Sequence, residues 1–95
     1  MKPSVTITYC VGCNWLLRAG WMAQELLSIF KDDLSGVTLA PAEVPGTYKI
    51  TVGDTMLWDR KRDGGFPEAK ELKKRLRDVI EPGRNLGHLD RNSQT

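Results

Sequence analysis

The chain has 95 residues, of which 40% are apolar and 27% charged, and its formal net charge is +2. These values predict a single folded domain and exclude a disordered chain. The basic excess is small and is not interleaved with aromatic residues, so no nucleic-acid partner is expected. No apolar run approaches the roughly 18 residues of a membrane span, and no signal-peptide pattern is visible. We therefore expect a cytoplasmic protein with no membrane partner.

The first half of the chain predicts a strand, a helix and a second strand. Residues 4–9 alternate between polar and apolar side chains, as in a strand with one covered face. From Val11 to Phe30 the apolar residues recur at steps of three and four, which is typical of an amphipathic helix. Residues 37–42 read as another strand, and Pro41 favours a place at the edge of the sheet.

The second half predicts a hairpin followed by a helix. Gly53–Asp54 separates strands at 48–52 and 55–59 and suits a tight turn. Residues 60–65 read as a charged loop, and Pro67 is suited to the first position of a helix that ends before Pro82.

The resulting order, β-α-β-β-β-α, predicts a small α/β sandwich of thioredoxin-like type. Its sheet would be mixed and four-stranded, with two helices. We expect one domain over residues 1–83 and a polar tail over residues 84–95. That tail contains His88, which we expect to be solvated rather than a ligand or a base.

Two cysteines lie three residues apart where the first strand gives way to the helix. Cys10 is expected at the strand end and Cys13 in or near the first helical turn, where the positive end of the helix stabilises a thiolate. Gly12 between them is expected to remove side-chain bulk beside the sulfur atoms. This spacing permits a disulfide, so one sulfur could attack a substrate and the other resolve the mixed disulfide.

Two other interpretations of the pair stay open. The cysteines could be two small buried apolar residues. They could also form half of a metal site, but four ligands would then require a dimer that donates two pairs. In a reducing compartment a close cysteine pair is more often catalytic or metal-binding than structural. We favour the redox pair because of its spacing and its strand-to-helix position, and because the chain offers only one histidine as a further cysteine or histidine ligand.

Exposed apolar residues suggest two candidate partner surfaces. Leu17 and Trp21 fall on the polar side of the first helix, side by side and near Cys13. In the register set by the hairpin turn, Met56 and Trp58 share the sheet face opposite the helices. The alternative is that single exposed apolar residues carry no function, or that the tail covers them.

The stretches YCVGC, YKITVGDTMLWDRKRDGGFPEAKELK and PGRNLGH resemble the selenoprotein W/T/H (Rdx) family, in its bacterial members with cysteine in place of selenocysteine. The resemblance implies a thioredoxin-like fold and a thiol-redox role linked to glutathione or thioredoxin-type partners. The family's selenocysteine position corresponds to Cys13, whereas thioredoxin logic favours Cys10 as the more exposed attacking sulfur. Thioredoxin folds also place a cis-proline beside the cysteines, for which Pro45 is the candidate; an ordinary Pro–Gly turn is the favoured alternative.

These observations predict a thiol–disulfide redox protein that acts through a reversible Cys10–Cys13 disulfide. No bound cofactor is expected, although glutathione could be a co-substrate that residues 60–62 attract. A protein disulfide is the other expected partner, and a homodimer stays open, as does turnover as an enzyme. The alternatives are a non-enzymatic redox-sensing interaction module and a dimeric metal-binding protein.

Overall fold

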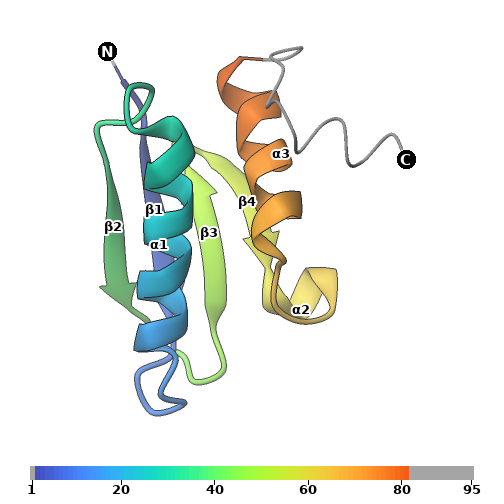
Figure 1. The fold of residues 1–95 in the computed structure, drawn as a ribbon. Helices are drawn as coiled ribbons and strands as arrows, with labels where there is room; N and C mark the ends of the chain where they lie inside the picture. The colour runs from blue at the N-terminus through green and yellow to red at the C-terminus, as the bar shows by residue number, and fades with distance from the viewer. Residues whose placement is uncertain (1, 82–95) are drawn as a thin grey trace.

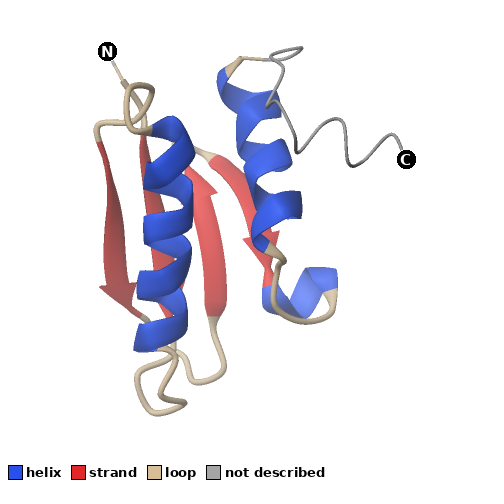
Figure 2. Cartoon of the chain, viewed as in Figure 1, coloured by secondary structure: helices blue, strands red, loops and turns tan. Residues whose placement is uncertain are grey.

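The computed structural model describes residues 2–81. The elements, in chain order, are β1 (Ser4–Tyr9), α1 (Leu16–Phe30), β2 (Gly36–Pro41), β3 (Tyr48–Val52), β4 (Thr55–Asp59), α2 (Arg60–Asp63) and α3 (Ala69–Ile80). The strands form one mixed sheet in the order β2-β1-β3-β4, and α1 and α3 cover the same face of it (Figures 1 and 2). The predicted thioredoxin-like α/β sandwich is confirmed. The predicted tail over residues 84–95, with His88, lies outside the described residues.

β1 is an inner strand of the sheet and supplies much of the core. Successive side chains of a strand point to opposite faces, so every second residue of β1 faces the helices. Val5, Ile7 and Tyr9 are buried, whereas Thr6 and Thr8 alternate with them on the other face. β1 pairs in parallel with β2 and antiparallel with β3, so the apolar rows of the three strands share one layer. The core is completed by residues of α1, β3, β4, α3 and one loop: Ala19, Met22, Ala23, Leu26, Phe30, Leu34, Tyr48, Ile50, Val52, Leu57, Trp58, Leu72 and Leu76.

The first helix begins later than the apolar pattern predicts. A turn occupies the cysteine segment, in which the N–H of Asn14 donates to the carbonyl of Val11 at 3.0 Å. Asn14 has a φ of 62°, which a helical residue cannot adopt but asparagine tolerates. Trp15 is then the N-cap and Leu16 the first helical residue, so Cys13 lies before the first helical turn rather than in it.

The hairpin of β3 and β4 has the predicted turn but not the predicted register throughout. Thr51 pairs with Met56, as a two-residue turn requires, but Ile50 pairs with Trp58 and leaves Leu57 as an inserted residue. Such a bulge moves every following side chain to the other face of the sheet. The prediction that Trp58 lies on the open face is therefore wrong, because the bulge turns it toward the helices.

Contacts from later segments hold Trp58 in this position. Its indole N–H donates to the carbonyl of Gly65 at 2.8 Å. The guanidinium of Arg75 in α3 lies 4.5 Å from the ring and also donates to the carbonyl of Leu57 at 2.9 Å. Trp58 is only 8% exposed, whereas Met56 stays partly exposed on the other face.

The segment predicted as a charged loop contains a short helix, α2, in addition to the two helices that were predicted. The carboxylate of Asp59 accepts from the N–H of Lys61 at 3.1 Å and thereby caps it. α3 begins at Ala69, two residues after Pro67, and its buried Lys73 pairs with Glu25 of α1 at 3.0 Å. Within residues 2–81, no helix is both long and apolar enough to cross a membrane.

Candidate functional site: a cysteine pair at the sheet end

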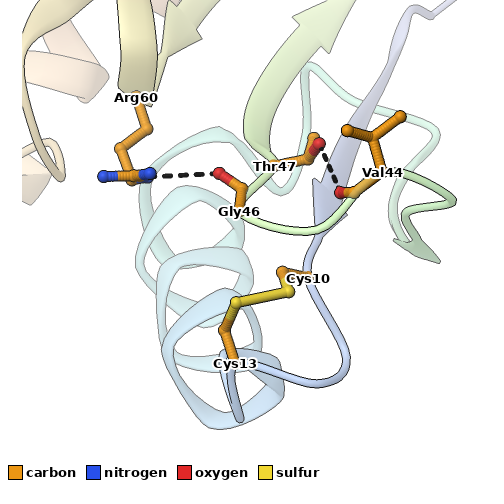
Figure 3. The surroundings of a disulfide bond; sticks show 6 residues. All are labelled: Cys10, Cys13, Val44, Gly46, Thr47 and Arg60. Atoms are coloured by element: carbon orange, nitrogen blue, oxygen red, sulfur yellow. Dashed lines mark hydrogen bonds between the residues drawn. A yellow bond between two sulfur atoms is a disulfide. The ribbon is translucent and has the colours of Figure 1, made fainter.

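The two cysteines form a disulfide in the turn between β1 and α1 (Figure 3). Their Cα atoms are 5.4 Å apart, which is an ordinary separation for a disulfide. The N–H of Trp15 reaches back to the carbonyl of Cys10 at 3.4 Å and closes the turn onto the helix start. The segment therefore brings the sulfur atoms together directly before the positive end of α1.

Cys10 and Cys13 differ in their accessibility. Cys10 is 4% exposed, whereas Cys13 is partly exposed. The connection from β2 to β3 runs beside the end of β1, where the N–H of Ala42 donates to the carbonyl of Tyr9 at 2.8 Å. The expectation that Cys10 is the more exposed member is therefore wrong, and a reagent in solution reaches Cys13 more easily.

The start of α1 provides positive potential near the sulfur atoms. The first N–H groups of a helix lack partners within the helix and carry a partial positive charge. No acidic side chain in the first turn of α1 offsets this charge, and no side chain caps it. A thiolate released from either cysteine would be stabilised there, as the strand-to-helix position predicts.

Three aromatic rings and two arginines pack beside this turn, a group that the sequence does not predict. Trp15 contacts the ring of Phe66 edge-on at 4.9 Å, and Phe66 contacts Tyr48 at 5.1 Å. The guanidinium of Arg18 lies 3.9 Å from the centre of the Phe66 ring, and that of Arg60 lies 5.1 Å from Trp15. These residues come from separate segments, so neither spacing nor periodicity indicates that they meet.

Tyr48 is the most deeply buried polar side chain of this group. Its hydroxyl has no hydrogen-bond partner among the described residues. Burial raises the pKa of Tyr48 from 10.0 to about 12, and the positive charge of Arg18 offsets that rise only in part. The phenol is therefore neutral at physiological pH, and its ring packs edge-on against Trp15 and Phe66.

The turn before β3 lies beside the cysteine segment, as the labelled Val44, Gly46 and Thr47 show in Figure 3. Pro45 belongs to this turn. No peptide bond in the described residues is cis, so Pro45 belongs to an ordinary Pro–Gly turn and not to a cis-proline loop. Gly46 has a φ of 80°, a conformation that favours glycine, and the hydroxyl of Thr47 donates to the carbonyl of Val44 at 2.7 Å. The alternative interpretation of Pro45 is the one that fits.

The remaining predicted site residues divide into two groups. Leu17 and Trp21 are 86% and 50% exposed and lie at the cysteine end of α1, as expected. Gly12 lies between the cysteines, and a Cβ atom there would meet nothing within 4 Å outside its chain neighbours Val11 and Cys13. Met56 and Trp58 lie on opposite faces of β4, so they do not form one surface.

A metal site at this pair would need further ligands near the two cysteines. Within residues 2–81, no group of three or more histidine, cysteine, aspartate or glutamate side chains could hold a metal ion. The two cysteines are bonded to each other. This geometry shows that the pair can form an intramolecular disulfide.

Comparisons with known proteins agree with this site. The Rdx family matches residues 4–78. A crystal structure of a protein from Bordetella parapertussis is 54% identical, with a TM-score of 0.81 over 84% of this chain and 100% of that one. A selenoprotein W-related protein from Vibrio cholerae is 44% identical, with a TM-score of 0.81 over 85% of this chain and 100% of that one.

No match was found among curated proteins. The family match and the Cys10–Cys13 pair together support a redox-type role. By its sequence, its fold and its cysteine pair, the chain belongs to the Rdx family.

Proposed function

We propose that this protein is a thiol–disulfide exchange protein in which Cys13 is the residue that meets the partner and Cys10 is the resolving cysteine. The observation that carries the assignment is the difference in exposure, since Cys10 is 4% exposed and Cys13 is partly exposed. The family's selenocysteine position corresponds to Cys13, which also favours Cys13 as the residue that meets the partner.

The proposed reduction of the partner starts from the dithiol form. The Cys13 thiolate attacks one sulfur of a partner disulfide, that disulfide breaks, and the other partner sulfur leaves as a thiolate with the electron pair. The Cys10 thiolate then attacks Cys13 and releases the second partner sulfur. The partner gains two electrons and two protons, and Cys10 and Cys13 lose the same number as they form their disulfide.

The reverse reaction uses the same atoms. A partner thiolate attacks Cys13 of the disulfide, and Cys10 leaves as a thiolate beside the positive end of α1. A second partner thiolate then releases Cys13 and closes a disulfide in the partner. Which direction operates depends on the difference between the two reduction potentials.

Single-cysteine variants test the assignment. Cys10→Ser should accumulate a mixed disulfide through Cys13 when the reduced protein meets a peptide disulfide, because no resolving thiol remains. Cys13→Ser should form at least about tenfold less in the same time, since Cys10 is buried. Mass spectrometry of the intact protein gives both yields. A larger yield from Cys13→Ser would reverse the roles.

Turnover separates an enzyme from a redox-sensing module. A catalyst should reduce many equivalents of a peptide disulfide when glutathione or a thioredoxin system regenerates the dithiol. A sensor would react once and then stay oxidised.

A further inference from the structure

Exposed apolar side chains are concentrated at the end of the molecule that carries the cysteines. Five of the seven large exposed hydrophobic residues within 2–81 lie in the cysteine turn, in the first two turns of α1 or in the connection before β3: Val11, Leu16, Leu17, Trp21 and Val44. Leu17 is the most exposed of them at 86%, and Trp21 follows it one helical turn later. Singly exposed apolar residues are common, whereas exposed apolar residues gathered on one part of the surface mark interaction sites.

A cleft opens within this surface. It has a volume of about 420 Å³ and is lined by Tyr9, Val11, Asn14, Leu16 and Leu17. Neither cysteine lines the cleft, but Tyr9 and Val11 flank Cys10 and Asn14 follows Cys13, so the cleft lies at the cysteine turn. Its volume lies within the range of sites that bind ligands, which is enough for a side chain that neighbours a bound sulfur.

The charges around the cleft indicate what it would accept. The lining contains no aspartate, glutamate, lysine, arginine or histidine. The two arginines of the neighbouring aromatic group are engaged, Arg18 with the Phe66 ring and Arg60 with Trp15 and the carbonyl of Gly46. An apolar side chain would contact Val11, Leu16 and Leu17 there, whereas an anion would find no cationic side chain in the lining and would meet only the potential at the start of α1.

We propose that the partner of this site is a protein whose reactive cysteine adjoins an apolar side chain, and that this side chain packs into the cleft while the sulfur reacts at Cys13. The proposal rests on thiol–disulfide exchange as the function of the pair. It names the substrate class: an apolar polypeptide segment next to a cysteine, in preference to a small anionic thiol such as glutathione. Leu17 and Trp21 extend the contact along α1.

Three disulfides test this selectivity. Two are disulfide peptides of equal length and charge, one with leucine and one with serine after the cysteine, and the third is glutathione disulfide. The second-order rate of reduction by the reduced protein is divided by the rate with dithiothreitol, which removes the intrinsic reactivity of each disulfide. The leucine peptide should react about tenfold faster than the others on this scale, as expected for partial burial of one leucine side chain.

A variant pair locates the effect. Leu17→Ser should lower the ratio of the leucine-peptide rate to the hydroxyethyl disulfide rate about five- to tenfold. Because Leu17 is 86% exposed, this variant removes no core contact and should fold. Leu27→Ser is the matched control, since Leu27 is an exposed leucine nearer the other end of the same helix, at 36%.

The outcomes distinguish this inference from the proposed function. Equal normalised rates for the three disulfides, or equal effects of Leu17→Ser and Leu27→Ser, would overturn the inference and leave exchange at Cys13 intact. Failure to react with any disulfide, including hydroxyethyl disulfide, would overturn both. A dimer in sedimentation that Leu17→Ser converts to a monomer would show that a second copy occupies the surface, which also overturns the inference.

Discussion

The side chain of Arg60 donates from Nε to the carbonyl oxygen of Gly46 at 3.2 Å, across the end of the sheet that carries the disulfide (Figure 3). The same guanidinium lies 5.1 Å from the ring of Trp15. One side chain at the start of α2 thus connects the turn before β3 with the N-cap of α1. The cysteine turn is therefore held between elements that are distant in sequence.

Removing this connection should destabilise the protein. We expect Arg60→Ala to lower the free energy of unfolding by about 1–2 kcal/mol, from one partly buried hydrogen bond and one cation–π contact. Chemical denaturation followed by tryptophan fluorescence measures the change. Lys61→Ala, at the next and exposed position, is the control and should change little. An equal effect of the two variants would show that the Arg60 contacts contribute nothing.

Tyr48→Phe should not destabilise the protein at pH 7. The hydroxyl that it removes is buried and has no hydrogen-bond partner among the described residues, so the variant loses no bond and is expected to gain up to about 1 kcal/mol. Thermal or denaturant unfolding at neutral pH measures this. A loss of more than about 1 kcal/mol would show that the hydroxyl makes a stabilising bond.

The same tyrosine predicts a pH dependence at the alkaline end. Its pKa is raised from 10.0 to about 12 in the folded protein, so the unfolded chain ionises first. The contribution of the neutral phenol to the free energy of unfolding is fully present below pH 10 and is lost as the pH rises from 10 to about 12. Wild type should therefore lose more stability than Tyr48→Phe across this interval. Parallel stability curves for the two proteins would contradict the raised pKa.

Asp63 predicts the opposite dependence at the acidic end. The backbone N–H of Asp59 donates to its carboxylate at 2.9 Å, and this bond, followed by that from Arg62, lowers the pKa of Asp63 below 3.8. Stability from this carboxylate is present above pH 3.8 and is lost as the pH falls through the lowered pKa.

Asp63→Asn should therefore be less stable than wild type at neutral pH, and the difference should shrink at acidic pH. Denaturant unfolding at a series of pH values checks both statements. Asp54→Asn, in the exposed turn between β3 and β4, should match wild type at neutral pH. A difference between wild type and Asp63→Asn that does not shrink with acid would contradict the account.

Gly12→Val separates folding from partner access. A Cβ added at Gly12 would meet no atom within 4 Å outside its two chain neighbours, so the variant should fold with nearly wild-type stability. It places bulk beside the sulfur atoms, where a partner must approach. We expect reaction with a protein disulfide to slow several-fold and reaction with hydroxyethyl disulfide to change little. Equal slowing of both reactions would place the effect on the cysteines themselves.

The parts of the fold that depend on neighbouring residues could be predicted from the sequence. Alternation defines β1, Gly53–Asp54 defines the hairpin turn, and the spacing of Cys10 and Cys13 suffices for the pair. The face on which Trp58 lies could not be predicted. The bulge that turns it inward is held by Arg75 and Gly65, which come later in the chain and carry no signal for that contact.

The same distinction applies to the site. The place of the cysteines at the strand-to-helix junction follows from local pattern, but their relative exposure depends on the connection before β3. The aromatic group around Trp15 brings Tyr48 and Phe66 together from distant segments. Sequence periodicity describes one helix or strand at a time, so contacts between residues of different elements are seen only in the folded structure.

The central claim is that Cys10 and Cys13 exchange reversibly between dithiol and disulfide. The most direct test equilibrates the purified protein in glutathione or dithiothreitol redox buffers and counts alkylated thiols by mass. We predict a single two-electron transition between roughly −180 and −290 mV, the range of known exchange proteins. If both thiols remain free to alkylate across that whole range, no intramolecular disulfide operates there and the exchange function is wrong.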